Sequence, residues 1–382
     1  MKRVYIAIFG SGLGHATRMM AVVRRLQQDG CDLMCSSSEE ATGYLRMQGL
    51  ACNDIPLVDV VFTENGNFSA TDTMKVAPWL ILKVFKQVGI EARNMIRFRP
   101  DVLLSDSLVS SVMASKLLGL KSVTVLNQLM LVSSPNTPRR VAKLLSTGSI
   151  TVGNEFWELS DRILFPDLPP PYTISESNLW DSGTVGARAE YIGLLTLPRS
   201  YDLDQETEKI LQTRKKIIFW QVSGPAKTRN HFLTKARGAA AALGAEYLSI
   251  ISAGNPLGSS SPTAIEGGYL YDWCLSKDVL IDRCDVMVSR AGHVTISDLI
   301  LRGKPSILVP IAAQSEQIGN ATKAQKLGVA VCIREEEFSV KAFVDALVYV
   351  GSDEMKRRCA DLADYAGQFD AVGSIVRALT AN

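Results

Sequence analysis

Short apolar runs alternate along the chain with longer segments in which apolar residues recur every three or four positions. Val4–Phe9, Cys31–Cys35 and Asp101–Ser105 are runs of the first kind and predict buried strands. Met19–Leu26 has the helical spacing and lies between the first two runs. Because strand–helix–strand order needs crossover connections, the first half of the chain is predicted to form a parallel sheet covered by helices.

The pattern is interrupted between residues 166 and 214, where prolines cluster and a polar, charged stretch follows. Proline-rich sequence resists regular structure, so we expect the connection between two lobes here. The alternation then returns, with strands expected at Lys216–Trp220, Tyr247–Ile251, Cys284–Ser289, Pro305–Val309 and Val329–Ile333. The prediction is therefore two doubly wound α/β lobes, whose ligands would bind beyond the carboxyl ends of the strands, in a cleft between the lobes.

The composition narrows the class of protein. Lys and Arg number 41 against 39 for Asp and Glu, and this balance argues against a dedicated nucleic-acid binder. The seven cysteines are scattered without a pairing pattern, which is typical of a reducing compartment. The chain has no apolar run long enough for a membrane span, and the apolar start is too short for a signal peptide. We therefore expect a soluble, cytoplasmic protein.

The first candidate site is the glycine-rich loop Gly10–Arg18, which follows the first predicted strand. It lacks the spacing of a dinucleotide-binding or phosphate-binding loop. It does contain His15, and imidazole is the side chain best suited to accept a proton near neutral pH. Asp106, at the end of the strand Asp101–Ser105, is expected at the same edge, where a carboxylate would hold the imidazole in one tautomer. The alternative that Asp106 caps the following helix stays open at this point.

The second candidate site lies in the second lobe, where residues 288–298 run from a strand through Gly292 into a helix. Backbone amides at Gly292 to Thr295 would hold a diphosphate, and Asp298 would reach a ribose. A polar cluster after the next strand suits the hydroxyl groups of a sugar: Gln314, Glu316, Gln317 and Asn320. The alternative is a helix start with ordinary polar caps.

Segment 288–321 resembles the donor-binding region of GT-B-fold glycosyltransferases, closest to family 28. That family includes the N-acetylglucosaminyltransferase that makes lipid II and the monogalactosyl-diacylglycerol synthases. Four motifs carry the resemblance: R-x-G-x-x-T-x-S-[DE] at Arg290, Gly292, Thr295, Ser297 and Asp298; Q-x-x-N-A at Gln317, Asn320 and Ala321; G-x-G-H-x-x-R at Gly12, Gly14, His15 and Arg18; and a spaced D…D…A pattern at Asp101, Asp106 and Ala114.

The resemblance implies an inverting, metal-independent glycosyltransferase with a nucleotide-diphosphate sugar, expected to be UDP-linked, as co-substrate and no cofactor. It implies His15 as the base, Asp106 as its partner, and Gly12, Gly14 and Arg18 as the acceptor-side loop. The donor nucleotide and diphosphate would be bound by Ser223, Gly224, Arg290, Gly292, His293, Val294, Thr295 and Asp298, and the donor sugar by Gln314, Glu316, Gln317 and Asn320. Close relatives carry Glu in place of Asp298 and a small residue in place of His293, so the role of His293 stays open.

The same resemblance divides the chain into an acceptor-binding lobe, residues 1–195, and a donor-binding lobe, residues 196–367. The C-terminal helix 368–382 would cross back to brace the first lobe. The sugar, the acceptor, the linkage and the oligomeric state do not follow from the sequence.

Residues 74–99 interleave basic and apolar side chains, among them Lys83, Lys86, Trp79 and Phe85. Such a helix either seats on an anionic membrane surface, as a lipid-linked acceptor would favour, or packs its apolar side on the core with its lysines in solvent. The first interpretation implies a peripheral position on the inner face of the membrane.

Other functions on the same fold also stay open. A nucleotide-sugar hydrolase would use the loop histidine to activate water, and a 2-epimerase would need further acids and histidines. A non-catalytic nucleotide-sugar-binding subunit is the third alternative.

Overall fold

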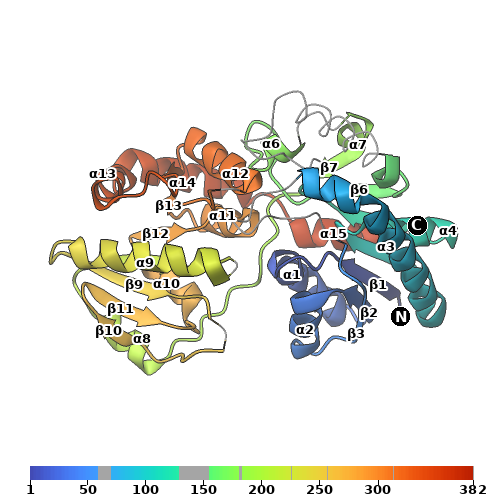
Figure 1. Cartoon of the computed structure of the whole chain (residues 1–382), viewed down its shortest axis with the longest axis horizontal. Coiled ribbons are helices and arrows are strands. Elements are labelled where there is room, and N and C mark those ends of the chain that lie inside the picture. Colours follow the sequence, from blue (N-terminus) through green and yellow to red (C-terminus); the bar gives the residue numbers. More distant parts are fainter. Residues whose placement is uncertain are drawn as a thin grey trace. The chain divides into compact units, whose positions relative to one another are not determined.

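The computed structural model describes residues 1–58, 70–128, 155–179, 183–224, 226–255, 257–312 and 314–381, except for the side chains of residues 70–78, 183, 184, 226 and 227. The chain divides into two compact units (Figure 1). Unit 1 comprises Met1–Leu197, Ala313–Glu316 and Phe369–Asn382, and unit 2 comprises Pro198–Ala312 and Gln317–Gln368.

Unit 1 is built on a sheet of parallel strands in the order β3-β2-β1-β4-β5-β6-β7. Its strands are β1 (Arg3–Ile8), β2 (Asp32–Ser37), β3 (Cys52–Asp54), β4 (Val102–Asp106), β5 (Ser122–Val125), β6 (Arg162–Phe165) and β7 (Ala189–Tyr191). Its helices are α1 (Gly14–Gln28), α2 (Glu39–Met47), α3 (Ala70–Phe98), α4 (Val109–Leu117), α6 (Glu176–Leu179), α7 (Gly183–Arg188) and α15 (Ala371–Thr380). The order reverses between β1 and β4, which is where doubly wound sheets bind ligands.

Alternate residues of β1 enter two different cores, as a strand covered on both faces requires. Val4, Ile6 and Ile8 pack against α1, α2 and α15. Tyr5 and Ala7 pack on the other face against α3 and α4.

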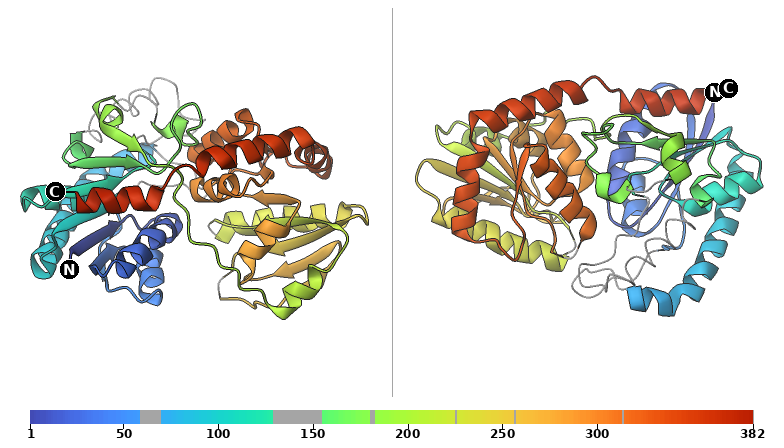
Figure 2. Two further views of the ribbon diagram at one scale, coloured as in Figure 1. Left: turned by 180° about the vertical axis from the view of Figure 1, so that it is seen from behind. Right: turned by 90° about the horizontal axis from the view of Figure 1, so that it is seen from above.

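The C-terminal helix α15 is part of the first of these cores. Ile375 and Leu379 are almost fully buried, and Lys2 donates its Nζ to the Leu379 carbonyl at 2.6 Å. Figure 2 shows α15 (dark red) lying along the sheet of unit 1.

Unit 2 repeats the architecture with the strand order β10-β11-β9-β8-β12-β13-β14, in which β10 alone pairs antiparallel. Its strands are β8 (Lys216–Gln221), β9 (Tyr247–Ser252), β10 (Thr263–Ile265), β11 (Gly268–Tyr271), β12 (Val286–Ser289), β13 (Ser306–Leu308) and β14 (Ala330–Cys332). Its helices are α8 (Gln205–Ile210), α9 (Ala226–Ala242), α10 (Lys277–Arg283), α11 (His293–Leu301), α12 (Ser315–Lys326, whose first residues are grouped with unit 1), α13 (Val340–Val350) and α14 (Asp353–Ala366).

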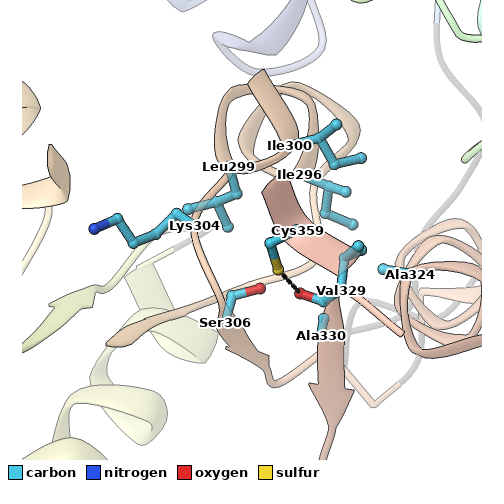
Figure 3. Close-up of a pocket in the computed structure, with 9 residues that line it drawn as sticks. All are labelled: Ile296, Leu299, Ile300, Lys304, Ser306, Ala324, Val329, Ala330 and Cys359. Carbon is cyan, nitrogen blue, oxygen red and sulfur yellow. Dashed lines mark hydrogen bonds between the residues drawn. The ribbon is translucent and has the colours of Figure 1, made fainter. Parts of the chain in front are cut away.

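The sheet of unit 2 is also covered on both faces. An aromatic cluster of Trp220, Phe232, Phe338 and Phe343 lies under α9 and α13. On the other side, α11 and α14 enclose a cavity of about 10 Å³ (Figure 3). Cys359 lines this cavity and donates its thiol to the Val329 carbonyl at 3.6 Å. Mostly apolar side chains line it, so it is a packing defect of the core rather than a sugar site.

The predicted fold class, α/β with two Rossmann-like units, is confirmed. The strands expected from apolar runs are present within one or two residues of their predicted bounds. The expectation of irregular structure from residue 166 onward is wrong in part, because β7 completes the sheet of unit 1 and α8 precedes β8. β7 has three residues, too few for an alternation to stand out in a proline-rich stretch.

Candidate functional site

In the loop after β1, the backbone lies so close to a neighbouring segment that only glycine fits. A Cβ at Gly10 would lie 2.5 Å from the Ser38 carbonyl oxygen, and Gly12 has a φ of +73°. Gly14, the first residue of α1, has open space around its Cα. Only Gly10 and Gly12 are therefore required by the turn itself.

His15, Arg18 and Asp106 form one polar cluster at this edge. His15 and Arg18 lie in the first two turns of α1, and Asp106 is the last residue of β4, paired with Ile8 of β1. The Nδ1 of His15 lies 3.0 Å from Oδ1 of Asp106. Arg18 donates Nε to Oδ2 of Asp106 at 2.9 Å and Nη2 to Oδ1. The switch point of the sheet therefore brings together three residues of the predicted acceptor-side site.

The geometry constrains the tautomer of His15. Its Nδ1 also lies 3.1 Å from Nη2 of Arg18, which can only donate. A hydrogen on Nδ1 makes the bond to Asp106 and excludes the bond from Arg18. That tautomer leaves the lone pair on Nε2, and the side chain of His15 is 20% exposed.

The carboxylate of Asp106 is fully buried and strongly stabilised in its charged form. Burial raises the pKa of Asp106, but the charge of Arg18 and the hydrogen bonds with His15 and Arg18 outweigh burial, and its pKa lies well below the usual range. Ser107 adds a hydrogen bond to Oδ1 at 3.2 Å and adopts a left-handed φ of 56°. Asp106 is therefore an anion at neutral pH.

In unit 2 the candidate donor edge centres on the N-terminus of α11. Gly292 is the N-cap, and a Cβ there would meet nothing closer than Oγ1 of Thr295, at 3.9 Å. Gly224, after β8, has a φ of +105°. Thr295 is half-buried, whereas His293 is 5% exposed. A helix N-terminus with no side chain at its cap lets a diphosphate approach the backbone amides.

Other predicted donor residues bond to backbone groups within unit 2. Asn320 is fully buried and donates Nδ2 to the Ala291 carbonyl at 3.4 Å. Gln317 accepts the Ile311 amide at 3.1 Å. Arg290 is 1% exposed and donates to the carbonyls of Val309 and Thr228. These bonds join the loops after β12 and β13.

Asp298 forms an ion pair that the sequence pattern did not predict. Its Oδ1 accepts Nε of Arg302 at 2.8 Å. The same guanidinium, 2% exposed, also pairs with Asp278 and Asp282 of α10. Burial lowers the pKa of Arg302, but the bonds to Asp298 and Asp282 outweigh it and raise that pKa. One side of the Asp298 carboxylate is therefore fixed within unit 2.

Three buried polar atoms around the end of β12 have no hydrogen-bond partner among the residues that the structure describes: Oγ of Ser289, Nε of Arg290 and Oδ1 of Asn320. Buried polar groups are normally paired with protein or with ordered water.

Helix α3 packs on the core over its C-terminal part and exposes large apolar side chains between residues 79 and 85. Val88, Met95 and Phe98 are buried, whereas Trp79, Ile81, Leu82 and Phe85 are 57–69% exposed. The interpretation that the apolar side of this helix packs on the core is therefore wrong for these four residues. Figure 2 shows α3 (light blue) running along the outside of unit 1. Met74 and Lys75, part of the predicted segment, have side chains outside the described residues.

Over the described part of the chain, no group of three or more His, Cys, Asp or Glu residues is arranged to hold a metal ion. Within the same ranges, no helix is long and apolar enough to cross a membrane. All seven cysteines are free thiols.

Comparison with known proteins shows which families and structures this chain is similar to. Residues 274–364 match the glycosyltransferase family 28 C-terminal domain. An uncharacterized glycosyltransferase of Methanosarcina mazei is 24% identical over 334 residues, covering 85% of this chain and 84% of that protein. The UDP-N-acetylglucosamine–N-acetylmuramyl-(pentapeptide) pyrophosphoryl-undecaprenol N-acetylglucosamine transferase of Clostridium tetani is 37% identical over 75 residues, 19% of this chain and 21% of that protein.

The solved structure of the spinosyn rhamnosyltransferase SpnG complexed with thymidine diphosphate matches with a TM-score of 0.70 and 16% identity, covering all of both chains. Together these similarities identify the chain as a glycosyltransferase with the GT-B fold. The matched residues, 274–364, include segment 288–321, whose motifs predicted this similarity.

Proposed function

We propose that the protein transfers a sugar from a UDP-sugar to the hydroxyl group of a lipid-linked acceptor, with inversion at the anomeric carbon and without a metal ion. The observation that carries this proposal is the 3.0 Å contact between Nδ1 of His15 and Oδ1 of Asp106 at the switch point of unit 1. A partly exposed imidazole with an anchored Nδ1 has its Nε2 available as a base.

In the proposed step, Nε2 of His15 takes the proton of the acceptor hydroxyl. The acceptor oxygen forms its bond to the anomeric carbon while the bond from that carbon to the diphosphate oxygen breaks. One in-line displacement inverts the configuration. Asp106 holds the imidazole and stabilises the imidazolium, and Arg18 keeps Asp106 ionised and in place.

The diphosphate would lie against the amides of Gly292 to Thr295, beside Ser223 and Gly224. The positive end of α11 stabilises the charge that develops on the departing diphosphate, which supports a mechanism without a metal ion. Oδ2 of Asp298 would accept a ribose hydroxyl while Arg302 holds Oδ1. UDP is proposed because the Clostridium tetani relative is named for a UDP-sugar.

Gln314, Glu316 and Gln317 are proposed to bind the donor sugar, since they lie in or beside the first turn of α12 and are partly exposed. Asn320 and Arg290 are buried, so we propose that they support the loops rather than contact the donor. His293 is proposed to contribute its backbone amide.

The exposed apolar half of α3 supports an acceptor or surface that is itself apolar. Lys83 and Lys86 are exposed between its apolar residues, a combination suited to an anionic lipid surface. We propose a peripheral position on the cytoplasmic face of the membrane.

The test is transfer from radiolabelled UDP-sugars to lipid and soluble acceptors, with and without EDTA, comparing wild type with His15→Ala. Product of inverted configuration, formed equally with EDTA and lost in the variant, is expected. Release of free sugar by wild type without any acceptor would instead indicate a hydrolase.

A further inference from the structure

Glu335, in the segment after β14, contacts three separate parts of the donor edge. Its Oε1 accepts Nη2 of Arg290 at 2.8 Å and faces Nδ1 of His231 at 3.1 Å. Its Oε2 accepts the Ala312 amide at 3.4 Å. Arg290 follows β12, Ala312 follows β13, and His231 lies in α9. One carboxylate therefore joins two loops and a helix.

Arg290 extends this network. It donates Nη1 to the Val309 carbonyl and Nη2 to the Thr228 carbonyl, both at 3.0 Å, and its guanidinium lies 4.4 Å from the ring centre of Phe232. Its side chain is 2% exposed, so it needs a nearby counter-charge, and Glu335 supplies one.

The charge of Glu335 is maintained by this contact. Burial raises the pKa of Glu335, but the bond to Arg290 and its charge outweigh burial and lower that pKa. The carboxylate and the guanidinium neutralise each other, so the loops can be held by an anion without repelling a bound diphosphate.

The sequence did not single out this residue. Glu335, Glu336 and Glu337 form a charged run typical of a solvated loop. In the structure Glu335 is 7% exposed, whereas Glu336 and Glu337 are exposed.

We infer that Glu335 is the positioning residue of the donor edge: through Arg290 and the Ala312 amide it fixes the loops after β12 and β13, and the affinity for a nucleoside diphosphate depends on it. The part of this inference that concerns affinity rests on the proposed function. The part that concerns the loops does not.

The experiment compares the full-length wild type with Glu335→Gln and Glu335→Ala. Hydrogen exchange of the ligand-free proteins is measured over peptides covering residues 289–294 and 309–314, and binding of UDP and of dTDP is measured by calorimetry. Asp204→Asn is the matched control, because Asp204 also accepts three hydrogen bonds in unit 2, from the Thr207 amide and hydroxyl and the Ser276 hydroxyl.

Exchange in both peptides is expected to accelerate about tenfold in Glu335→Ala and less in Glu335→Gln, which keeps an acceptor for the Ala312 amide. The dissociation constant of the nucleotide is expected to rise about tenfold in Glu335→Ala, with partial rescue in Glu335→Gln. Asp204→Asn should change exchange near α8 and leave nucleotide affinity unchanged.

Hydrogen exchange that is unchanged in both peptides of both Glu335 variants overturns the inference, whatever the nucleotide affinity of these variants. Accelerated exchange with wild-type nucleotide affinity overturns its functional part. If wild type binds neither nucleotide but the exchange result is as expected, the positioning of the loops is supported and the proposed donor is wrong. Should Glu335→Ala fail to fold, Glu335→Gln alone decides between these outcomes.

Discussion

Arg18 donates to both carboxylate oxygens of Asp106, with Nε at 2.9 Å from Oδ2 and Nη2 on Oδ1, although the two residues are 88 positions apart. Both side chains are essentially buried. This bidentate interaction fixes the orientation of the Asp106 carboxylate. His15 therefore also has a fixed hydrogen-bond partner.

Arg18→Gln removes the cation from this pair and leaves a buried carboxylate uncompensated. We expect a loss of about 3–5 kcal/mol in the free energy of unfolding at pH 7. Because Arg18 lowers the pKa of Asp106, the stability that this ionised group contributes is present above the ordinary Asp pKa and is lost as pH falls through the folded-state pKa. The variant should therefore begin acid unfolding at a higher pH.

Urea titration at several pH values measures both effects. Arg25→Gln is the control, because Arg25 pairs with Asp29 at the surface, and it should cost less than about 1 kcal/mol. Equal losses in the two variants would contradict the assigned role of Arg18.

Asp106→Asn keeps the shape of the site and removes the charge that orients His15. We expect transfer to fall by about 10²–10⁴-fold while nucleotide binding is retained, since the diphosphate site that we propose lies in unit 2. Initial rates with a UDP-sugar and calorimetry with UDP check the two halves of this prediction. Activity within a few fold of wild type would show that His15 works without a carboxylate partner.

Gly292→Ala tests the diphosphate site proposed at the start of α11. The added methyl group meets nothing closer than 3.9 Å in the protein, so the variant should fold with wild-type stability. It should nevertheless weaken UDP binding by about tenfold or more, because the methyl group occupies space proposed for the diphosphate.

Gly238→Ala is the matched substitution in the same unit, at a position in α9 with open space around the Cα. It should raise stability by about 0.5–1 kcal/mol and leave UDP binding unchanged. Wild-type UDP affinity in Gly292→Ala would show that the diphosphate does not bind at the N-terminus of α11.

The buried carboxyl of Glu91 predicts a pH-dependent stability. It accepts the Ser36 hydroxyl at 2.7 Å and the Tyr5 hydroxyl at 2.5 Å, and burial raises its pKa from 4.5 to about 7. Between these values the folded chain binds more protons than the unfolded chain, so stability falls as pH rises.

Glu91→Gln should abolish this slope and be more stable than wild type at pH 8 by on the order of 2–3 kcal/mol. Tyr5→Phe, which removes a donor and keeps the carboxyl group, should instead destabilise at pH 8. Urea unfolding at pH 5 and pH 8 separates the variants, and a wild-type slope in Glu91→Gln would contradict this account.

Lys83→Glu with Lys86→Glu tests the contact that we propose between α3 and a membrane surface. The double variant should lose binding to vesicles containing anionic lipid, because each lysine near such a surface contributes about 1 kcal/mol. Trp79→Ser with Phe85→Ser should weaken binding through the loss of apolar contact.

The control carries Lys116→Glu and Leu117→Ser on α4, where Leu117 is 75% exposed. It should bind vesicles as wild type does. Cosedimentation measures all three variants, and a wild type that never binds vesicles would remove the peripheral membrane position from the proposal.

Local sequence was sufficient for the architecture. A strand buried on both faces needs a run such as Val4–Phe9, and a covering helix needs apolar residues at helical spacing, so both appear within a few consecutive positions. The candidate donor segment could also be predicted from local sequence, because Gly292 and Thr295 belong to one strand–helix turn.

The contacts between segments that are distant along the chain could not be predicted from the sequence. Glu335 has the same local sequence context as Glu336, and only the packing of the loops after β12 and β13 buries one and exposes the other. Arg302 lies one helical turn after Asp298, so this pair could have been expected from the sequence. The burial of Arg302 and its further ion pairs with α10 depend on the packing of α10 against α11.

Helix α3 shows the same division. The sequence pattern predicted that residues 74–99 interleave basic and apolar residues, as a helix can, and that the loop of His15 follows one strand while Asp106 ends another. The exposure of Trp79 and Phe85, and the contact of Arg18 with both oxygens of Asp106, became known from the three-dimensional structure. Periodicity is set by residues within one or two turns, whereas burial and charge pairing are set by segments that meet only when the sheet has formed.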